Sequence, residues 1–308
     1  MIPAQRPINV STAEATLGDV LERVALAETL GCDQIWLEQQ PDERDALIAA
    51  CEYLRAAPSA VVGTGVLPIY ARHPVAAATA AMTLGEASGG RFALGLGYSH
   101  YFVNDYILGQ KQGPPLVAMR EYLAIVRSLL DSGNANVQGE HFTAHARYRP
   151  PRPRVPLVIA ALRPGMIRLA AEFADGMLLW LCPTRYIKDK VMPAVYRACE
   201  EVGRDPADFD VIAPVSSYVG PRPDEVSGAF FRTLDAYRLI PLYRQVMEYG
   251  GLYDPHDLAI IGTEAYAQDR MEEYRAAGVT PAVSPLGDTL DEFHETVTAV
   301  YGPAPTRA

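Results

Sequence analysis

The chain has 308 residues, 49% of them hydrophobic, which is enough apolar material for one α/β domain over residues 1–308. Its net charge of −10 argues against binding to nucleic acid or a membrane surface, because those partners need a basic face. The four cysteines lack C-x-x-C spacing, and no apolar run approaches the roughly 18 residues of a membrane span. We therefore expect a cytoplasmic protein with reduced thiols and no metal site.

Strand and helix patterns alternate along the whole chain. Short apolar runs predict strands over residues 8–10, 34–37, 60–67, 91–96, 156–161, 177–181, 210–219 and 280–284. Helical spacing of apolar residues predicts helices over 18–30, 44–56, 75–87, 116–130, 166–174, 188–202 and 290–300. This alternation predicts a (β/α)8 TIM barrel. An open doubly wound sheet is disfavoured because the chain lacks a full G-x-G-x-x-G motif.

Extra segments lengthen this minimal barrel, and we expect insertions after strands four, five and seven. Residues 102–115 and 136–156 are rich in Pro, Gly and aromatic residues, and a helical insertion covers about 224–257. Such insertions usually build a substrate pocket or a lid, but the last one could equally form a dimer interface. His141 and His145 lie in a loop or short hairpin without a third ligand, which disfavours a metal site.

Residues 88–100, with the sequence SGGRFALGLGYSH, combine a turn, a buried strand and a glycine-rich exit. Glycines 89 and 90 let the chain reverse cheaply. Gly95 and Gly97 leave no side chain where the strand ends, so a planar ligand could approach the backbone there. Ligands of parallel α/β proteins bind at the carboxyl ends of the strands, which is where Tyr98, Ser99 and His100 follow.

Several short motifs occur in a recognisable order between residues 36 and 278. They are ARHP at 71–74, SGGR at 88–91, IAALRPGM at 159–166, ADG at 174–176 and IGTE at 261–264. The series resembles the bacterial luciferase-like superfamily, which comprises luciferase-like monooxygenases and F420-dependent oxidoreductases. The resemblance implies a TIM barrel that binds FMN or the deazaflavin coenzyme F420 and acts on a small molecule. It also implies a homodimer, which is usual in the family.

The resemblance assigns two parts of a cofactor site. A planar ring is expected over the barrel mouth, against the residues Gly63, Thr64, Gly65, Val66, Gly97, Tyr98 and Ser99. A strained or cis peptide is expected near Gly65–Val66. A phosphate is expected at the helix start after strand five, where backbone N–H groups and the Arg163 guanidinium are donors, in the run Ala161, Leu162, Arg163, Pro164, Gly165 and Met166.

Two residues are candidates for acid–base chemistry. His100 titrates near neutrality, so it could donate a proton, although it could also only hydrogen-bond the cofactor. Glu38 is the titratable group at the end of strand two, where Gln39 stands in place of a histidine found in many F420-dependent relatives. Burial beside the ring would raise the pKa of Glu38, but the carboxylate could equally be exposed. Candidate substrate walls are Trp36, Tyr70, Tyr101, Trp180 and Tyr218.

The motif series resembles the deazaflavin branch more than the flavin branch. It predicts an F420-dependent oxidoreductase that transfers a hydride between the deazaflavin and a small organic substrate. The alternative is an FMN-dependent two-component monooxygenase, which would need a separate flavin reductase as its partner. A non-catalytic barrel is a third hypothesis, because the strand-two histidine is missing. The chemistry of the cofactor ring distinguishes the F420 hypothesis from the FMN hypothesis, since a 5-deazaflavin does not support the flavin-peroxide chemistry of the monooxygenases.

Overall fold

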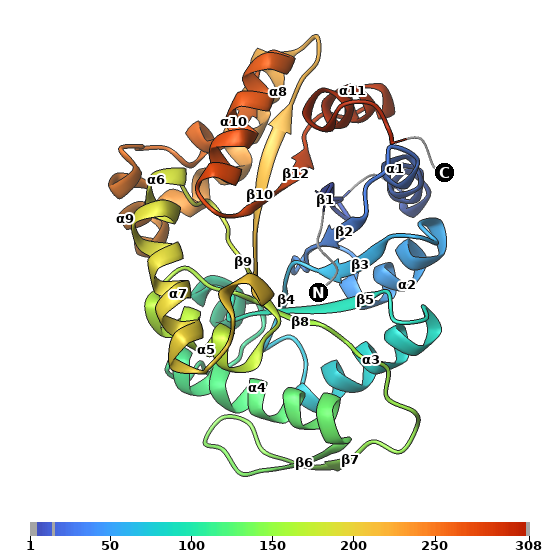
Figure 1. The fold of residues 1–308 in the computed structure, drawn as a ribbon, viewed down its shortest axis with the longest axis vertical. Helices are drawn as coiled ribbons and strands as arrows, with labels where there is room; N and C mark the ends of the chain where they lie inside the picture. The colour runs from blue at the N-terminus through green and yellow to red at the C-terminus, as the bar shows by residue number, and fades with distance from the viewer. Residues whose placement is uncertain (1–4, 14–15, 306–308) are drawn as a thin grey trace.

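In the computed structural model, which describes residues 5–13 and 16–305, the central strands close into a parallel barrel (Figure 1). Its eight strands are, in order, β1 (Pro7–Asn9), β2 (Gln34–Leu37), β3 (Val61–Thr64), β5 (Phe92–Gly97), β8 (Leu157–Ala160), β9 (Gly176–Leu178), β10 (Asp210–Tyr218) and β12 (Thr280–Pro285). The last strand pairs with the first, with Val283 opposite Ile8, so the sheet has no open edge. The predicted (β/α)8 barrel is confirmed.

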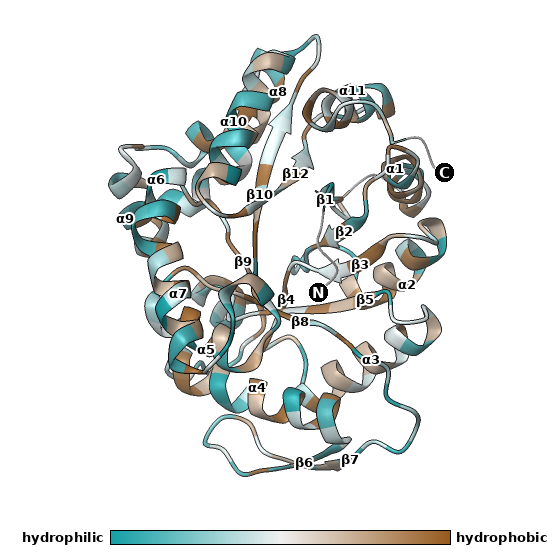
Figure 2. Cartoon of the chain, viewed as in Figure 1, coloured by the Kyte–Doolittle hydropathy of each residue, from teal (hydrophilic) through white to brown (hydrophobic). Residues whose placement is uncertain are grey.

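Helices follow the strands and surround the barrel (Figure 1). They are α1 (Leu17–Thr29), α2 (Ala46–Ala56), α3 (Pro74–Ala87), α4 (Pro115–Ser132), α5 (Pro164–Phe173), α6 (Thr184–Tyr186), α7 (Met192–Glu201), α8 (Pro223–Leu234), α9 (Pro241–Gly250), α10 (Glu264–Ala276) and α11 (Leu290–Tyr301). Hydrophobic residues concentrate on central strands such as β5, β8 and β9, and hydrophilic ones on outer helices such as α10 (Figure 2). None of the helices within the described ranges is long and apolar enough to cross a membrane.

The helix expected over 188–202 begins earlier than predicted. The chain is already helical from Thr184, and the short π-helix η2 (Ile187–Val191) joins α6 to α7. Pro193 lies just after this turn and has no N–H to donate, which favours a local change of helical winding. The predicted strand over 60–67 is likewise split into β3 and the short β4 (Leu67–Pro68), which pairs with β5.

The barrel interior is filled by side chains from successive strands. Trp36 lies there with Val61, Ala93, Val158, Leu178, Ile212 and Ala282. A Cβ atom on Gly63 would lie 2.4 Å from Cζ3 of Trp36, so the indole occupies space that only glycine leaves free. A second and larger core fills the layer between the strands and the helices.

The SGGR turn lies at the amino-terminal end of β5, opposite the end where the barrel strands finish. Gly89 and Gly90 have φ values of +66° and +90°, which L side chains adopt only with strain. The Arg91 guanidinium donates to the carbonyl oxygens of Leu54, Ala57 and Ala60 at 3.0–3.3 Å and thereby caps the end of α2. This turn therefore stabilises the barrel.

One predicted insertion lies elsewhere in the chain. Residues 134–147 form a hairpin of β6 (Asn134–Val137) and β7 (Ala144–Arg147), which precedes the fifth barrel strand, β8, instead of following it. The hairpin forms there because Gly133 ends α4 with φ +73° and turns the chain directly into β6. After β8 only residues 161–163 separate the strand from α5, so no insertion follows strand five.

The other two insertions are helical. After β5 the chain forms the π-helix η1 (Phe102–Ile107) before α4. After β10 it forms α8, η4 (Asp235–Leu239), α9 and η5 (Pro255–Leu258), followed by the short strand β11 (Ile260–Ile261) beside β10. A single 3-10 turn, η3 (Pro206–Asp208), precedes β10.

A buried carboxylate ties the end of β10 to the last helix. The Tyr218 hydroxyl donates to Glu292 Oε1 at 2.7 Å, and Arg222 donates to both oxygens of Glu292 at 2.9 and 2.7 Å. The N–H groups of Asp288 and Thr289 also donate to Glu292 Oε2, which completes the cap of α11. Hydrogen bonds from Arg222, above all, hold the pKa of Glu292 at about 2, well below its ordinary 4.5.

Glu292→Gln is expected to lower the free energy of unfolding by about 2 kcal/mol at pH 7. Arg222 is one-third exposed, so water screens the pair and the loss is smaller than the pKa shift alone would give. Because the folded-state pKa is depressed, the stabilisation is complete above pH 4.5 and is lost as the pH falls toward 2. Urea unfolding between pH 3 and 7 measures this, with Glu295→Gln on the exposed face of α11 as control. If the difference in unfolding free energy between Glu292→Gln and the wild-type protein does not change with pH, the depressed pKa is wrongly assigned to Glu292.

Candidate active site

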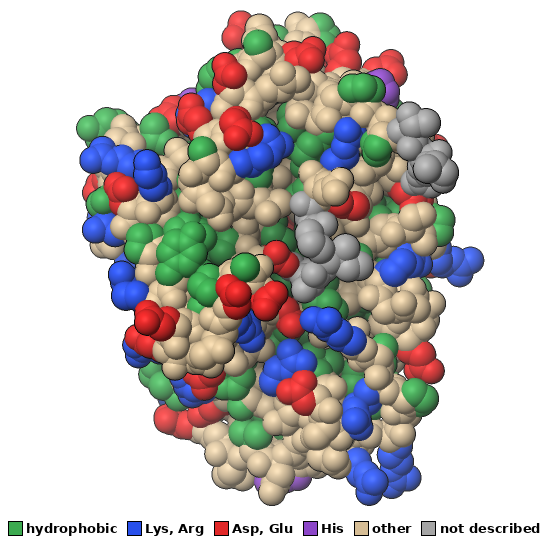
Figure 3. Space-filling view, viewed as in Figure 1, with side chains coloured by type: hydrophobic (Ala, Val, Ile, Leu, Met, Phe, Trp, Pro, Cys, Tyr) green, Lys and Arg blue, Asp and Glu red, His purple; other side chains and the backbone are tan. Residues whose placement is uncertain are grey.

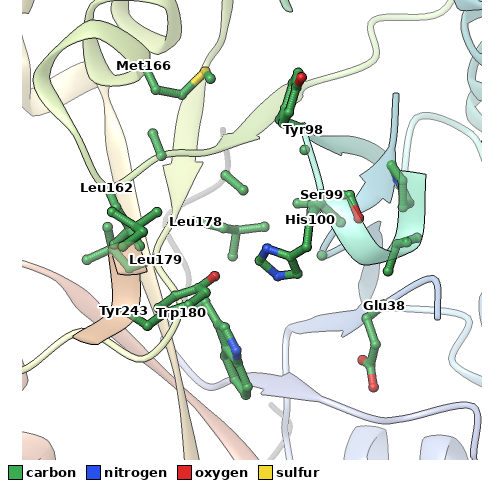
Figure 4. Close-up of a pocket in the computed structure, with 18 of the residues that line it drawn as sticks. Glu38, Tyr98, Ser99, His100, Leu162, Met166, Leu178, Leu179, Trp180 and Tyr243 are labelled. Atoms are coloured by element: carbon green, nitrogen blue, oxygen red, sulfur yellow. The ribbon is translucent and has the colours of Figure 1, made fainter. Parts of the chain in front are cut away.

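A cavity of about 660 Å³ opens at the carboxyl ends of the barrel strands (Figure 4). Asn9 of β1 and the segments after β2, β3, β5, β8 and β9 contribute to its walls, together with Pro214 of β10 and the insertion after β10. The sequence-predicted residues that line it are Glu38, Gly65, Val66, Gly97, Tyr98, Ser99, His100, Ala161, Leu162, Arg163, Gly165, Met166 and Trp180. Residues from seven segments far apart in the sequence therefore meet in one site.

The floor of the cavity is formed where the bulge after β3 meets β5. The peptide between Gly65 and Val66 is cis, as the resemblance implied. A Cβ atom on Gly97 would lie 2.5 Å from Cγ2 of Val66, so the missing side chain at 97 makes room for Val66 as well as for a ligand. Gly97→Val would therefore also displace Val66, and it is not a clean probe of ligand binding.

Two predicted cofactor residues lie beneath this floor. Thr64 is fully buried, and its hydroxyl both accepts from the N–H of Gly95 and donates to the carbonyl of Gly95, each at 2.8 Å. Gly63 packs against the Trp36 indole. Neither residue lines the cavity, because Thr64 is hydrogen-bonded to Gly95 of β5 and Gly63 packs against Trp36 of β2.

The start of α5 forms one rim of the cavity. Arg163 is the N-cap residue of this helix, and its side chain makes no capping hydrogen bond. Its exposed guanidinium donates to Oε1 of Gln245 on α9 at 2.7 Å. Pro164 has no N–H and does not line the cavity, whereas Gly165 and Met166 carry first-turn N–H groups of the kind that bind anions.

His100 is the titratable side chain at the centre of the site. Its imidazole packs edge-on against the rings of Tyr237 and Tyr243, each with a centroid distance of 5.7 Å. Burial lowers the pKa of His100 below its ordinary 6.5, so the ring is neutral at pH 7. Figure 4 shows this ring pointing into the open space, with Trp180 and Tyr243 on one side and Glu38 on the other.

The backbone around His100 is held in an unusual conformation. Ser99 has φ +68°, in the left-handed region that non-glycine residues rarely adopt. The fully buried Asn104 of η1 stabilises this turn, because its Nδ2 donates to the carbonyl of Tyr98 at 2.8 Å and its N–H to that of His100 at 3.0 Å. The turn thereby directs the imidazole into the cavity.

Glu38 and Gln39 share the loop after β2 but have different surroundings. Glu38 is half-buried, and its Oε2 accepts a hydrogen bond from Nδ2 of Asn9 at 3.1 Å. The Gln39 side chain accepts from the N–H of Ala46 and donates to the carbonyl of Gln40, each at 2.8 Å, so it braces the start of α2. Glu38 is therefore the residue of this pair that can act on a ligand.

The predicted insertion after β10 supplies part of the cavity wall. Tyr237, Leu242 and Tyr243 line the cavity. Tyr237 packs against Trp180 at a centroid distance of 6.2 Å and against Tyr243 at 5.3 Å. Burial raises the pKa of both tyrosines, so both keep neutral hydroxyl groups. Of the two predicted roles of this insertion, it fills that of a pocket wall.

Four of the five predicted substrate walls do not line the cavity. Trp36 fills the barrel interior, and Tyr218 is buried against Glu292. Tyr70 lies behind Tyr98, and its hydroxyl accepts from the N–H of Gly113 at 2.9 Å. Tyr101 is 71% exposed on the outer surface. Their places in strands or loops could be predicted, but the direction of each side chain could not.

Two histidines outside the cavity have local structural roles. His73 Nδ1 accepts a hydrogen bond from the N–H of Val75 and caps α3. His145 lies on β7 and is hydrogen-bonded to Asn136 across the hairpin. Within the described ranges no group of three or more His, Cys, Asp or Glu side chains is arranged to hold a metal ion.

Comparisons with known proteins agree with this geometry. Residues 1–281 match the model of the luciferase-like monooxygenase family. A 5,10-methylenetetrahydromethanopterin reductase of Methanolobus tindarius is 29% identical over 189 residues, which are 61% of this chain and 57% of the reductase. The chain thus spans little more than half the length of this relative.

Two solved structures share the fold at low sequence identity. An F420-dependent secondary alcohol dehydrogenase, in complex with an F420-acetone adduct, superposes with a TM-score of 0.83 at 18% identity, over 97% of this chain and 98% of that one. The oxygenating constituent of 3,6-diketocamphane monooxygenase of Pseudomonas putida, in complex with FMN, gives a TM-score of 0.74 at 13% identity, over 98% of each chain. With a family match over most of its length, the chain belongs to the luciferase-like monooxygenase family.

Proposed function

We propose that this protein is an F420-dependent oxidoreductase that transfers a hydride between the deazaflavin and a small organic substrate. One observation carries the proposal: a single cavity joins a glycine-lined floor, an open helix start with Arg163 at its rim, and a buried neutral imidazole. The relatives named for F420 or for a pterin reduction support the deazaflavin. When bound, the deazaflavin supplies the hydride chemistry, and the protein supplies binding and orientation.

The protein residues divide between the two ends of the cavity. Gly65, Val66 and Gly97 back the ring, because they present backbone and one small side chain to the cavity. The first-turn N–H groups of Gly165 and Met166, together with Arg163, bind the phosphate. Trp180 and the tyrosines of the insertion exclude water from the side where the substrate enters.

His100 is the proton carrier in this proposal. Because its imidazole is neutral at pH 7, one ring nitrogen can accept the hydroxyl proton of an alcohol as the hydride leaves. In the reverse direction the same nitrogen returns that proton to the substrate oxygen. Glu38 lies across the cavity, where its carboxylate orients the polar end of the substrate.

An FMN-dependent two-component monooxygenase is the second candidate. The fold it shares with an FMN-bound oxygenating constituent supports this reading. The same floor and helix start would serve FMN, since both cofactors combine a planar tricycle with a phosphate. Such an enzyme would take its electrons from a separate flavin reductase.

A pair of fluorescence titrations tests the choice of cofactor. Purified protein is titrated with oxidised F420 and, separately, with FMN. We expect F420 to bind at least about tenfold more tightly, a free-energy difference of about 1.4 kcal/mol. Tighter binding of FMN would favour the monooxygenase, and binding of neither would favour a non-catalytic barrel.

His100→Ala is expected to lower kcat by about 100-fold or more and to change the Kd for F420 by less than about threefold. The wild-type rate of substrate oxidation should fall as the pH drops through the lowered pKa of His100, below 6.5, because a base works only unprotonated. The rate of substrate reduction should instead rise as the pH drops through the same pKa, because the protonated imidazole is then the proton donor. The pH profile of kcat measures both, and an equal loss of kcat and cofactor affinity would assign His100 an orienting role instead.

Arg163→Ala is expected to weaken F420 binding about tenfold without unfolding the barrel, because the guanidinium is exposed and supplies a charge-assisted donor. Gln245→Ala is the matched control, since it removes the hydrogen-bond partner and leaves the charge in place. Its Kd should change less than about twofold. Equal effects of the two substitutions would mean that Arg163 acts only by anchoring α9.

A further inference from the structure

The cavity holds its two fully charged side chains at separate places. Among the described residues that line it, Glu38 is the carboxylate and Arg163 is the guanidinium. Glu38 follows β2 and Arg163 follows β8, and β3 and β5 lie between these two strands in the barrel. On the outer surface, by contrast, acidic and basic side chains are intermingled over much of the face in Figure 3. The two ends of the cavity therefore suit ligand groups of opposite charge.

The carboxylate at one end has a neutral hydrogen-bond partner. Glu38 is half-buried, and its Oε2 accepts from the side-chain amide of Asn9 at 3.1 Å. Glu38 forms no ion pair with any residue in the ranges 5–13 and 16–305. A ligand that places a positive charge here would supply a partner that the described part of the chain does not.

The loop that carries this carboxylate has an excess of negative charge. It holds Glu38, Asp42 and Glu43 against a single base, Arg44. Burial first, and then the charges of Glu38 and Asp42, raise the pKa of the Glu43 carboxyl, which shows that these acids lie close enough to repel one another. The Arg44 guanidinium offsets part of this charge, and it donates a hydrogen bond to the carbonyl of Thr12. The excess favours a cation at this end of the cavity.

Aromatic side chains line the cavity opposite Glu38. We call Trp180, Tyr237 and Tyr243 the aromatic wall. The plane of Tyr237 makes angles of 63° with Trp180 and 73° with Tyr243, so neighbouring rings of the wall are turned toward different directions. Figure 4 shows Trp180 and Tyr243 on one side of the open space and Glu38 on the other. Burial chiefly, with the charge of Glu38 in addition, raises the pKa of Tyr237, so the carboxylate acts on the wall electrostatically. Electron-rich rings opposite a carboxylate suit an ammonium group.

We propose that the substrate carries an ammonium group beside the group that is oxidised or reduced, and that this cation lies between Glu38 and the aromatic wall. The inference rests on the proposed function for the reacting group. The ammonium keeps its charge while a hydride leaves the neighbouring carbinol carbon for the deazaflavin and the hydroxyl proton passes to His100, which leaves a carbonyl group. The substrate class is therefore an amino alcohol or the matching amino ketone. A neutral polyol is disfavoured, because Leu179 and Leu242 beside the aromatic wall offer no hydrogen bonds to its hydroxyl groups.

Two probes of equal shape test the effect of charge. One is choline, and the other is the neutral alcohol with a tert-butyl group in place of the trimethylammonium group of choline. Ligand-observed NMR of their methyl signals gives both Kd values, on protein alone and on protein with saturating F420. We expect wild-type protein to bind choline at least about tenfold more tightly than its neutral analogue. Equal Kd values, or no detectable binding of either probe, overturn the cation site.

Substitutions locate the preference for the cation. Glu38→Gln keeps the size of the side chain and removes its charge, so the preference for choline should fall to about threefold or less while the Kd for the neutral analogue changes less than about twofold. Trp180→Leu should lower the preference about threefold, because it removes a ring and keeps an apolar wall. Asp42→Asn is the matched control, since it removes an equal charge from the same loop at an exposed position outside the cavity lining. If this control loses the preference as fully as Glu38→Gln, net charge alone is responsible and the cation site is overturned.

The outcomes distinguish this proposal from the proposed function. Protein that binds F420 without preferring choline overturns the ammonium substrate and leaves the F420 assignment intact. Protein that prefers choline and does not bind F420 supports the cation site and overturns the F420 assignment. Tighter binding of a neutral polyol such as erythritol than of choline would assign Glu38 to hydroxyl groups and overturn the proposal.

Discussion

The cavity depends on how closely β3 approaches β5. A Cβ atom on Gly95 would lie 1.7 Å from the carbonyl oxygen of Thr64, so no side chain fits at this position. The Thr64 hydroxyl then bridges the N–H and carbonyl groups of Gly95, so both backbone groups of this glycine are paired where the two strands converge. Because the strands meet here, the bulge at Gly65 and Val66 lies over β5 and forms the cavity floor.

A second constraint positions the imidazole of His100 above that floor. Holding Ser99 in the left-handed region costs about 1–3 kcal/mol, and the buried hydrogen bonds from Asn104 offset that cost. The turn carries His100 in among the tyrosines of the insertion, where desolvation disfavours the imidazolium. A neutral histidine suits proton exchange with a neutral hydroxyl or carbonyl group, because neither of these two partners then carries a permanent charge in an apolar space.

The barrel could be predicted because the spacing of apolar residues in strands and helices is a local property of the sequence. The end at which the cavity opens follows from the direction of the parallel strands. Residues 88–100 have two roles that the sequence did not distinguish. Arg91 precedes β5 and stabilises the amino-terminal end of the barrel, whereas His100 follows β5 and faces the cavity. Side-chain direction was harder to predict. Tyr218 ends a strand as expected but turns toward Glu292, since a shift of one residue in a strand reverses the face.

The path of the insertion could not be predicted for a different reason. Its position over the barrel is set by contacts between distant residues, such as Arg163 and Gln245, which are 82 positions apart. No periodicity within 224–257 encodes such a contact, so the structure was needed to show which tyrosines of this predicted insertion, Tyr237 and Tyr243, line the cavity. The resemblance could point to the cavity floor and the start of α5, because those motifs are local, but it could not point to the side walls of the cavity.

One helix of that insertion serves both ends of the site. On α9, Tyr243 is buried in the cavity wall, while Gln245 accepts a hydrogen bond from Arg163 at the start of α5. A change in the position of α9 would therefore alter both the space beside His100 and the contact that holds Arg163 at the cavity rim. Segments after barrel strands vary without disturbing the core, because the sheet and the inner helix faces carry most of the packing. The space beside His100 and the start of α5 can thus change together in this fold while Thr64 and Gly95 keep the floor in place.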